Sequence, residues 1–319
     1  MKRNLSTASA KLPSEHRARD QWIGRSQIAL AAVLWSTAGF FAKAPWFDAW
    51  PEESRGLLLG FWRALFAVPI LLPLIRKPSW NWSMLPMMIC FAVMVWSYMS
   101  AAVNGPVANA IWLQYLCPVW VMIVSVLIFG ERVSGPDLRM FVFCIGGVGL
   151  ILVCEMLKGS GLYATLLGVL SGMTFAGVVL FMRSIKNADP VWLIALNHSA
   201  TVALLAPWVW NEYPPIPTSG YWALGFFGVF QMSLAYILFA RGIRSTSSAE
   251  ASVLTLLEPI LVPVWVYVAW HHHATYEDPP WWTWCGGGLI TVGLVSRYIP
   301  GLVQAWRMER IADAHSVDS

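Results

Sequence analysis

Charged residues are scarce in this chain. Asp, Glu, Lys and Arg make up 12% of its 319 residues, about half the share found in average soluble proteins, while hydrophobic residues make up 57%. So few charges cannot cover the surface of the two water-soluble domains that this length would otherwise suggest. The composition therefore favours a protein whose residues lie mostly within a lipid bilayer.

Motifs of common enzymes are also lacking. The sequence contains no HExxH, GxSxG or GxxxxGK[ST] motif and no paired aspartates within an apolar segment. The cysteines are scattered through apolar segments without a CxxC pair, which argues against a disulfide framework or a metal site: Cys90, Cys117, Cys144, Cys154 and Cys285. We expect no enzyme, metal, cofactor or nucleic-acid partner. A polytopic membrane enzyme stays open as the alternative of another class.

Apolar runs fill most of the chain, and ten of them are long enough to cross a bilayer as helices of about 20 residues. They lie near residues 26–44, 56–75, 84–103, 107–129, 138–157, 161–182, 190–210, 220–240, 248–270 and 281–300. Most links between them hold turn-forming residues, such as Asn104-Gly105-Pro106. The pattern predicts an all-α membrane protein with ten transmembrane helices.

Basic residues predict the orientation of these helices. With the amino terminus inside, 17 of the 21 Lys and Arg residues fall on the inner side and three at outer ends. Residues 1–25 lack the apolar core of a signal peptide and are expected to form a disordered cytoplasmic arm. Residues 301–319 are expected to form a cytoplasmic tail. We expect a multi-pass protein of the cell (plasma or inner) membrane with both termini cytoplasmic.

An internal repeat relates the two halves of the chain. A shift of 141 residues places Pro118 on Pro259 and gives six identities between residues 108–121 and 249–262. The repeats are predicted at 26–158 and 159–300. Because each unit holds five helices, an odd number, the copies must cross the membrane in opposite senses. Such inverted repeats form transporters that alternate around a site near the midplane.

One carboxylate interrupts the ninth apolar run near its middle: Glu258, followed at once by Pro259. A charge at this depth costs a few kcal/mol and usually marks a function, although a protonated structural Glu is the alternative. Arg63 lies at similar depth in the second run. It could bind a substrate carboxylate, pair with Glu258, or hold backbone carbonyls of its own half.

Other polar and aromatic side chains at depth could line a substrate chamber. Gln114 and Gln231 are favoured because an amide both donates and accepts hydrogen bonds. The remaining candidate substrate-binding residues are Trp35, Tyr98, Tyr236 and Thr255. His198 is expected on a helix at the edge of the bundle. Glycines in the fifth and tenth runs predict that these two helices pack closely together, away from the chamber.

Four segments resemble the EamA-type branch of the drug/metabolite transporter superfamily. They are LAAVLWSTAGFFAKA (30–44), GFWRALFAVPILLPL (60–74), ANAIWLQYLCPVWVMIVSVLIFGERVS (108–134) and AEASVLTLLEPILVPVWV (249–266). The resemblance implies two five-helix repeats with a substrate chamber between them, and helices five and ten at the periphery. Two features depart from the family pattern. His271-His272-His273 stands where a second terminal Glu is expected, and Cys117 is the repeat counterpart of Glu258.

Repeat, midplane charges and resemblance together predict a secondary transporter. We expect an exporter of a small organic metabolite, an amino acid or a related amphipathic or aromatic solute, which works by alternating access, with a proton as the candidate coupling ion. A sugar-phosphate or nucleotide-sugar antiporter is the alternative within the same class. The sequence does not predict the oligomeric state.

Overall fold

Helices account for all regular secondary structure in the described part of the chain. The computed structural model describes residues 14–159, 161–185, 188–211, 218–273 and 276–317. Nine helical segments in these residues are long and apolar enough to cross a membrane. A further crossing is formed by α1 (Ser14–Ser36) and α2 (Ala38–Ala42). The prediction of an all-α, ten-helix fold is confirmed.

Each repeat contributes five crossings, some of them built from two helices in sequence. After α1 and α2, the first repeat holds α3 (Glu52–Leu71), α4 (Met84–Asn104), α5 (Val107–Gln114), α6 (Cys117–Phe129) and α7 (Gly135–Lys158). The second holds α8 (Leu162–Ser184), α9 (Pro190–Asn211), α10 (Thr218–Phe226), the π-helix η3 (Phe227–Leu234), α11 (Ala235–Gly242), α12 (Ser248–Thr255), α13 (Leu257–Trp270) and α14 (Trp281–Val317).

The first and last helices extend beyond the predicted membrane spans. Residues 14–25, expected within a disordered arm, are helical and continue into α1, while residues 1–13 lie outside the described part. Arg25 donates two hydrogen bonds to Glu250, at 3.1 and 2.7 Å, and this contact holds the helix against the second repeat. The predicted tail is likewise helical as far as Val317. Polar sequence outside the bilayer therefore continues the helices at this end.

Two of the crossings are broken at equivalent places. The break between α5 and α6 follows Gln114, and the break between α12 and α13 follows Thr255, which is 141 residues further on. Pro118 and Pro259 explain both breaks, because proline has no N–H to donate to the carbonyl four residues earlier. The backbone thus repeats the 141-residue spacing of the sequence.

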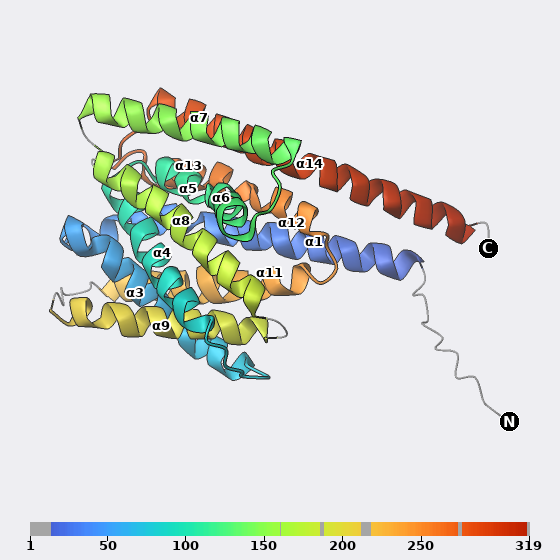
Figure 1. The fold of residues 1–319 in the computed structure, drawn as a ribbon. Helices are drawn as coiled ribbons and strands as arrows, with labels where there is room; N and C mark the ends of the chain where they lie inside the picture. Colours follow the sequence, from blue (N-terminus) through green and yellow to red (C-terminus); the bar gives the residue numbers. More distant parts are fainter. Residues whose placement is uncertain (1–13, 160, 186–187, 212–217, 274–275, 318–319) are drawn as a thin grey trace.

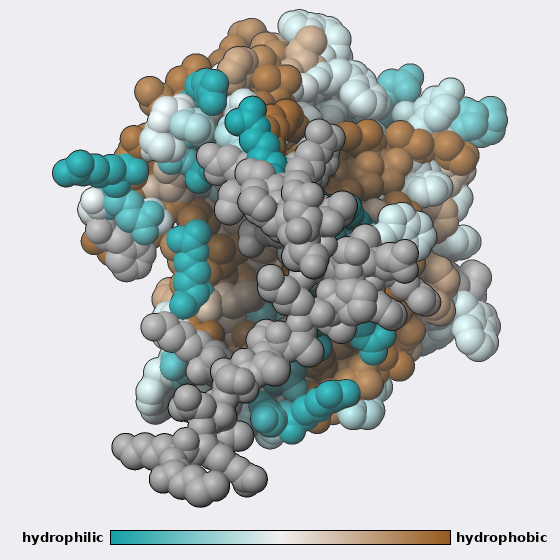
Figure 2. Space-filling model, turned by 90° about the vertical axis from the view of Figure 1, so that its right-hand side faces the viewer, coloured by the Kyte–Doolittle hydropathy of each residue, from teal (hydrophilic) through white to brown (hydrophobic). Residues whose placement is uncertain are grey.

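The bundle separates a peripheral helix pair from the remaining crossings. In Figure 1, α7 and α14 run side by side along one edge, and α14 projects beyond the bundle at the end where α1 begins. We call this end the terminal face and the opposite end the far face. Figure 2 looks onto the terminal face, where hydrophilic side chains gather, while hydrophobic side chains predominate around them. The largest core cluster joins both repeats, with residues of α2, α3, α4 and α5 from the first and of α8, α9, α10, η3 and α13 from the second.

Glycines allow α7 and α14 to approach closely. A Cβ atom on Gly147 would lie 2.5 Å from the Gly286 carbonyl oxygen, and one on Gly286 would lie 2.8 Å from the Gly147 carbonyl oxygen. Neither helix carries any of the predicted site residues. The glycines therefore serve helix packing, as in other membrane proteins.

Replacing Gly147 with alanine should destabilise the fold. The new methyl group would clash with the backbone of Gly286, which cannot move without disturbing its helix. Such overpacking lowers the free energy of unfolding by about 1–3 kcal/mol. The matched control is Gly146→Ala, because a Cβ atom there has no atom within 4 Å. Thermal unfolding in detergent should show a lower midpoint for Gly147→Ala only. Equal midpoints for the two variants would contradict the packing.

Candidate functional site

The two helix breaks meet across the interface between the repeats. Pro259 leaves the Thr255 carbonyl oxygen without its helical donor, and the Tyr115 hydroxyl lies 2.7 Å from that oxygen. The same hydroxyl lies 2.9 Å from Oε2 of Glu258, a half-buried residue in the first turn of α13. Tyr115 itself stands at the α5–α6 break. A side chain of the first repeat thus supplies the hydrogen-bond donor that the broken helix of the second repeat lacks.

The Tyr115 hydroxyl has one proton for two acceptors. If Glu258 is ionised, either its carboxylate or the Thr255 carbonyl lacks that donor. If Glu258 carries a proton, it can donate to Tyr115, whose own proton then serves Thr255. Both short contacts are satisfied only by the protonated carboxyl group, so the proton on Glu258 is linked to the contact between the repeats.

Arg63 supplies the opposite charge at this site. It is only 3% exposed, and its guanidinium carbon lies 5.4 Å from the centre of the Phe227 ring. It lies within electrostatic range of Tyr98, Tyr236 and Glu258. Among the described residues, however, it forms no ion pair with Glu258, and its Nε has no hydrogen-bond partner. The sequence left open a direct pair between Arg63 and Glu258, and the structure does not contain it.

Several buried polar atoms around Arg63 have no hydrogen-bond partner in the described part of the chain. They are Nε of Arg63, the hydroxyl of Tyr98, Nε1 of Trp35, Oε1 of Gln231 and both ring nitrogens of His198. Buried polar atoms are almost always hydrogen-bonded in proteins, to the protein itself, to water or to a ligand. These atoms form a polar cluster within an otherwise apolar bundle, and we refer to their surroundings as the candidate chamber.

Aromatic rings form one wall of the chamber. The Trp35 ring lies 5.1 Å from that of Tyr236 and 5.2 Å from that of Phe239, measured between centroids. Nε2 of Gln231 donates to the Trp35 carbonyl at 3.2 Å. Gln231 lies in η3, and π-helical turns occur frequently at functional sites. The sequence did not predict this turn, because its residues read as an ordinary apolar helix.

Two of the predicted residues take part differently from expectation. The Gln114 amide donates to Oγ of Ser171 on α8 at 2.8 Å, so one of its donors is used in packing. The Thr255 hydroxyl donates to the Ser252 carbonyl of its own helix, and its carbonyl oxygen is the group that meets Tyr115. The remaining candidates, Trp35, Arg63, Tyr98, Gln231, Tyr236 and Glu258, are brought together by the contacts described above.

The side chain of His198 faces the interior of the bundle, while its helix α9 lies along one edge in Figure 1, as the sequence predicts. Its side chain is fully buried, with the ring 5.1 Å from that of Phe91 and 5.9 Å from that of Tyr236. The reason is that α9 packs against both α3 and α4. Tyr115 was not predicted as a central site residue. Its place three residues before Pro118, at the break, is the signal that could have identified it.

Comparison with known proteins agrees with this architecture. The model of the EamA-like transporter family matches residues 22–153 and 162–297, one match for each repeat. An uncharacterized transporter of Archaeoglobus fulgidus is 26% identical over 273 residues, which cover 85% of this chain and 95% of that protein. The pseudopaline exporter CntI of Pseudomonas aeruginosa is 24% identical over 201 residues, or 62% of this chain and 68% of its own.

A solved crystal structure shares the fold. It superposes with a TM-score of 0.55 at 18% sequence identity and covers 88% of this chain and 97% of its own. With both repeats matched by the family model, the chain belongs to the EamA-like transporter family and is a multi-pass membrane transporter.

Proposed function

We propose that this transporter exports a small amphipathic solute that carries both an amino and a carboxylate group, in exchange for a proton. The observation that carries the proposal is that Arg63 and Glu258 lie within electrostatic range of each other but form no ion pair in the described part of the chain. Intramembrane charges are normally paired. A zwitterion that reaches both groups supplies the missing partner of each.

Arg63 would receive the carboxylate. A guanidinium group offers five N–H donors in a fork that fits a carboxylate with two parallel hydrogen bonds. Its Nε has no protein acceptor, and Tyr98 beside it has a hydroxyl without a partner that could donate to the same carboxylate. A highly phosphorylated solute is disfavoured because Arg63 is the one cation of this chamber among the described residues. This argues against the sugar-phosphate and nucleotide-sugar alternative.

Glu258 would hold either a proton or the amino group of the solute. The two occupants exclude each other, because a carboxylate that pairs with an ammonium group must first release its proton. Each solute bound then releases one proton, and reprotonation from the other side of the membrane resets the site. Competition for one group is sufficient to couple the two fluxes in opposite directions.

Tyr115 would transmit this exchange to the fold. When Glu258 gives up its proton, Tyr115 can no longer satisfy both Glu258 and the Thr255 carbonyl, so one contact between the repeats is weakened. The breaks in α5–α6 and α12–α13 provide the points at which the helices can rearrange. Occupancy of the chamber therefore shifts the balance between two arrangements of the repeats.

The aromatic wall formed by Trp35, Tyr236 and Phe239 suits the apolar body of such a solute. The name of the related pseudopaline exporter supports the direction of transport. Export also rests on the predicted orientation, with both termini in the cytoplasm. The membrane-enzyme alternative would be favoured by turnover of a solute without its movement across the membrane.

Glu258→Gln should abolish proton-coupled transport without unfolding the protein. The amide preserves the shape of the side chain but cannot titrate, so we expect solute flux in proteoliposomes to fall at least about tenfold and to lose its dependence on pH. Uptake measured across a series of imposed pH gradients provides the test.

Glu155→Gln is the matched control for this change. Glu155 is equally an intramembrane carboxyl, but it accepts hydrogen bonds from Asn109 and Trp282, both on Oε1, and an amide oxygen can replace that acceptor. The control should keep normal flux and pH dependence. An unaltered pH profile in Glu258→Gln would assign this residue to structure alone.

Arg63→Gln should weaken recognition of the carboxylate. Loss of a charge-assisted hydrogen bond costs roughly 1.5–3 kcal/mol, which corresponds to a roughly ten- to hundred-fold higher KM. The same variant should transport an amine that lacks the carboxylate as well as the parent protein does. Competition between a zwitterion and its decarboxylated analogue measures both effects, and equal losses for the two compounds would remove Arg63 from carboxylate binding.

A further inference from the structure

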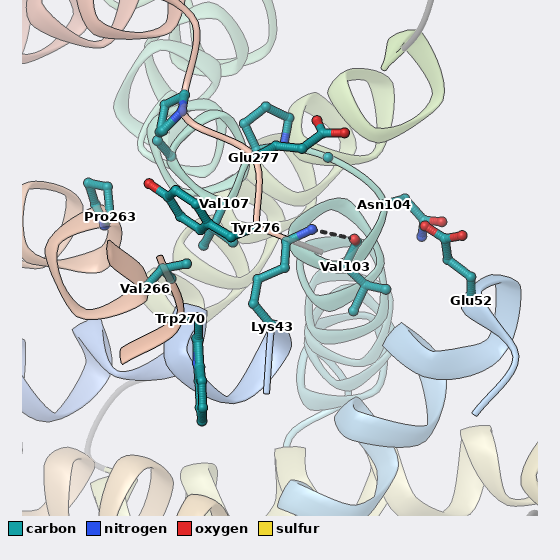
Figure 3. A pocket seen from close by; sticks show the side chains of 14 residues that line it. Lys43, Glu52, Val103, Asn104, Val107, Pro263, Val266, Trp270, Tyr276 and Glu277 are labelled. Atoms are coloured by element: carbon teal, nitrogen blue, oxygen red, sulfur yellow. Dashed lines mark hydrogen bonds between the residues drawn. The ribbon is translucent and has the colours of Figure 1, made fainter. Parts of the chain in front are cut away.

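A cavity lies at the far face, lined by residues other than those assigned to the chamber. Its volume is about 160 Å³. Both repeats line it, with Lys43, Val103 and Val107 from the first and Val266, Trp270 and Glu277 from the second (Figure 3). None of the residues assigned to the chamber contributes to its wall. The cavity thus opens along the same interface between repeats, at a different depth.

Lys43 gives this cavity a cationic centre. Its Nζ donates to the Val103 carbonyl at 2.7 Å, as Figure 3 shows, and it forms no ion pair within 4 Å among the described residues. An ammonium group has three N–H donors, so two remain for another acceptor. A half-buried ammonium that meets only one neutral oxygen is incompletely compensated. The natural complement is an anionic group.

The walls and the other charged groups restrict what that anion can be. Val107, Pro263 and Val266 present apolar surface, and the indole of Trp270 already uses its N–H on the Phe40 carbonyl at 2.9 Å. Glu52 and Glu277 also line the cavity and interact electrostatically with Lys43. Two carboxylates repel a dianion but attract an amino group.

We propose that this cavity is a second solute site, which takes a small amphipathic amino-carboxylate with its carboxylate on Lys43 and its amino group toward Glu277. The identity of the solute class rests on the function proposed above. The space is close to that of a cavity of about 150 Å³ that admits benzene, so a small solute fits and a nucleotide does not.

Its position places the two sites in series along one helix. Pro263 and Val266 line the cavity and follow Glu258 on α13 by five and eight residues, or about 8 and 12 Å of helix rise. A solute leaving the chamber toward the far face meets Lys43 next. With the orientation predicted from the basic residues, this is the external side, and the cavity is a release site.

Binding measurements on a protein whose chamber is disabled can isolate this site. In a background that combines Arg63→Gln with Glu258→Gln, which removes both charges of the chamber, calorimetry in detergent would compare three probes: phenylalanine, 3-phenylpropanoate and 2-phenylethylamine. We expect the two carboxylates to bind and the amine to bind at least tenfold more weakly. Adding Lys43→Gln should weaken binding of both carboxylates at least tenfold, because glutamine keeps a donor for Val103 but lacks the charge. Lys43→Arg should restore it.

The controls distinguish two roles of Lys43: binding a solute, or only donating a hydrogen bond to the Val103 carbonyl at the end of α4. If Lys43 serves only the carbonyl at the end of α4, Lys43→Gln will shift thermal stability without changing probe affinity, and the proposal is overturned. Absence of binding by all three probes in the background that combines Arg63→Gln with Glu258→Gln overturns it as well. Neither outcome bears on the chamber, whose test is transport by Glu258→Gln and Arg63→Gln with Lys43 intact.

Discussion

A missing backbone N–H organises the centre of this protein. Pro259 cannot donate to the Thr255 carbonyl, and an unpaired carbonyl is tolerated at membrane depth only where protein or water can satisfy it. Tyr115 from the other repeat meets this need, and in doing so its hydroxyl comes within hydrogen-bond distance of Glu258. The Tyr115 hydroxyl therefore connects three features: the helix break, the contact between the repeats and the titratable carboxyl group. The proposed coupling of proton and solute follows from the single proton that Tyr115 has to give.

The peripheral helix pair is held together differently from this centre. The α7–α14 pair is held together by backbone contact at Gly147 and Gly286, which needs no polar group. It is joined to α5 by Glu155, which accepts hydrogen bonds from Asn109 and Trp282. The buried carboxyl groups thus differ in their partners. Glu155 has two fixed donors, whereas Glu258 shares one hydroxyl proton with a backbone carbonyl, and this difference explains why only Glu258 is assigned a role in transport.

Most of the fold could be predicted from sequence because it depends on periodic and local signals. Apolar runs of bilayer length gave the crossings, and the 141-residue match around Pro118 and Pro259 gave the repeat. The extent of α1 and α14 was wrong, since polar residues outside a membrane carry no hydropathy signal. The helix that holds Arg25 is fixed by Glu250, which lies 225 residues away.

The site could be predicted in composition but not in pairing. Depth alone identified Glu258 and Arg63, yet whether they join depends on side-chain directions that a one-dimensional pattern does not contain. The burial of the His198 side chain could not be predicted for the same reason, and the π-helical turn at Gln231 has no local sequence signal. Lys43 read as a residue at a helix end, and only the fold shows that segments from both repeats close a cavity around it.

Proton release on solute binding tests the central claim most directly. Calorimetric titration of the detergent-solubilised protein with a transported zwitterion, repeated in buffers of different ionisation enthalpy, counts the protons that leave for each solute bound. The account predicts release of about one proton at a pH at which Glu258 is protonated, and none from Glu258→Gln. Tight binding by the parent protein without proton release would contradict it.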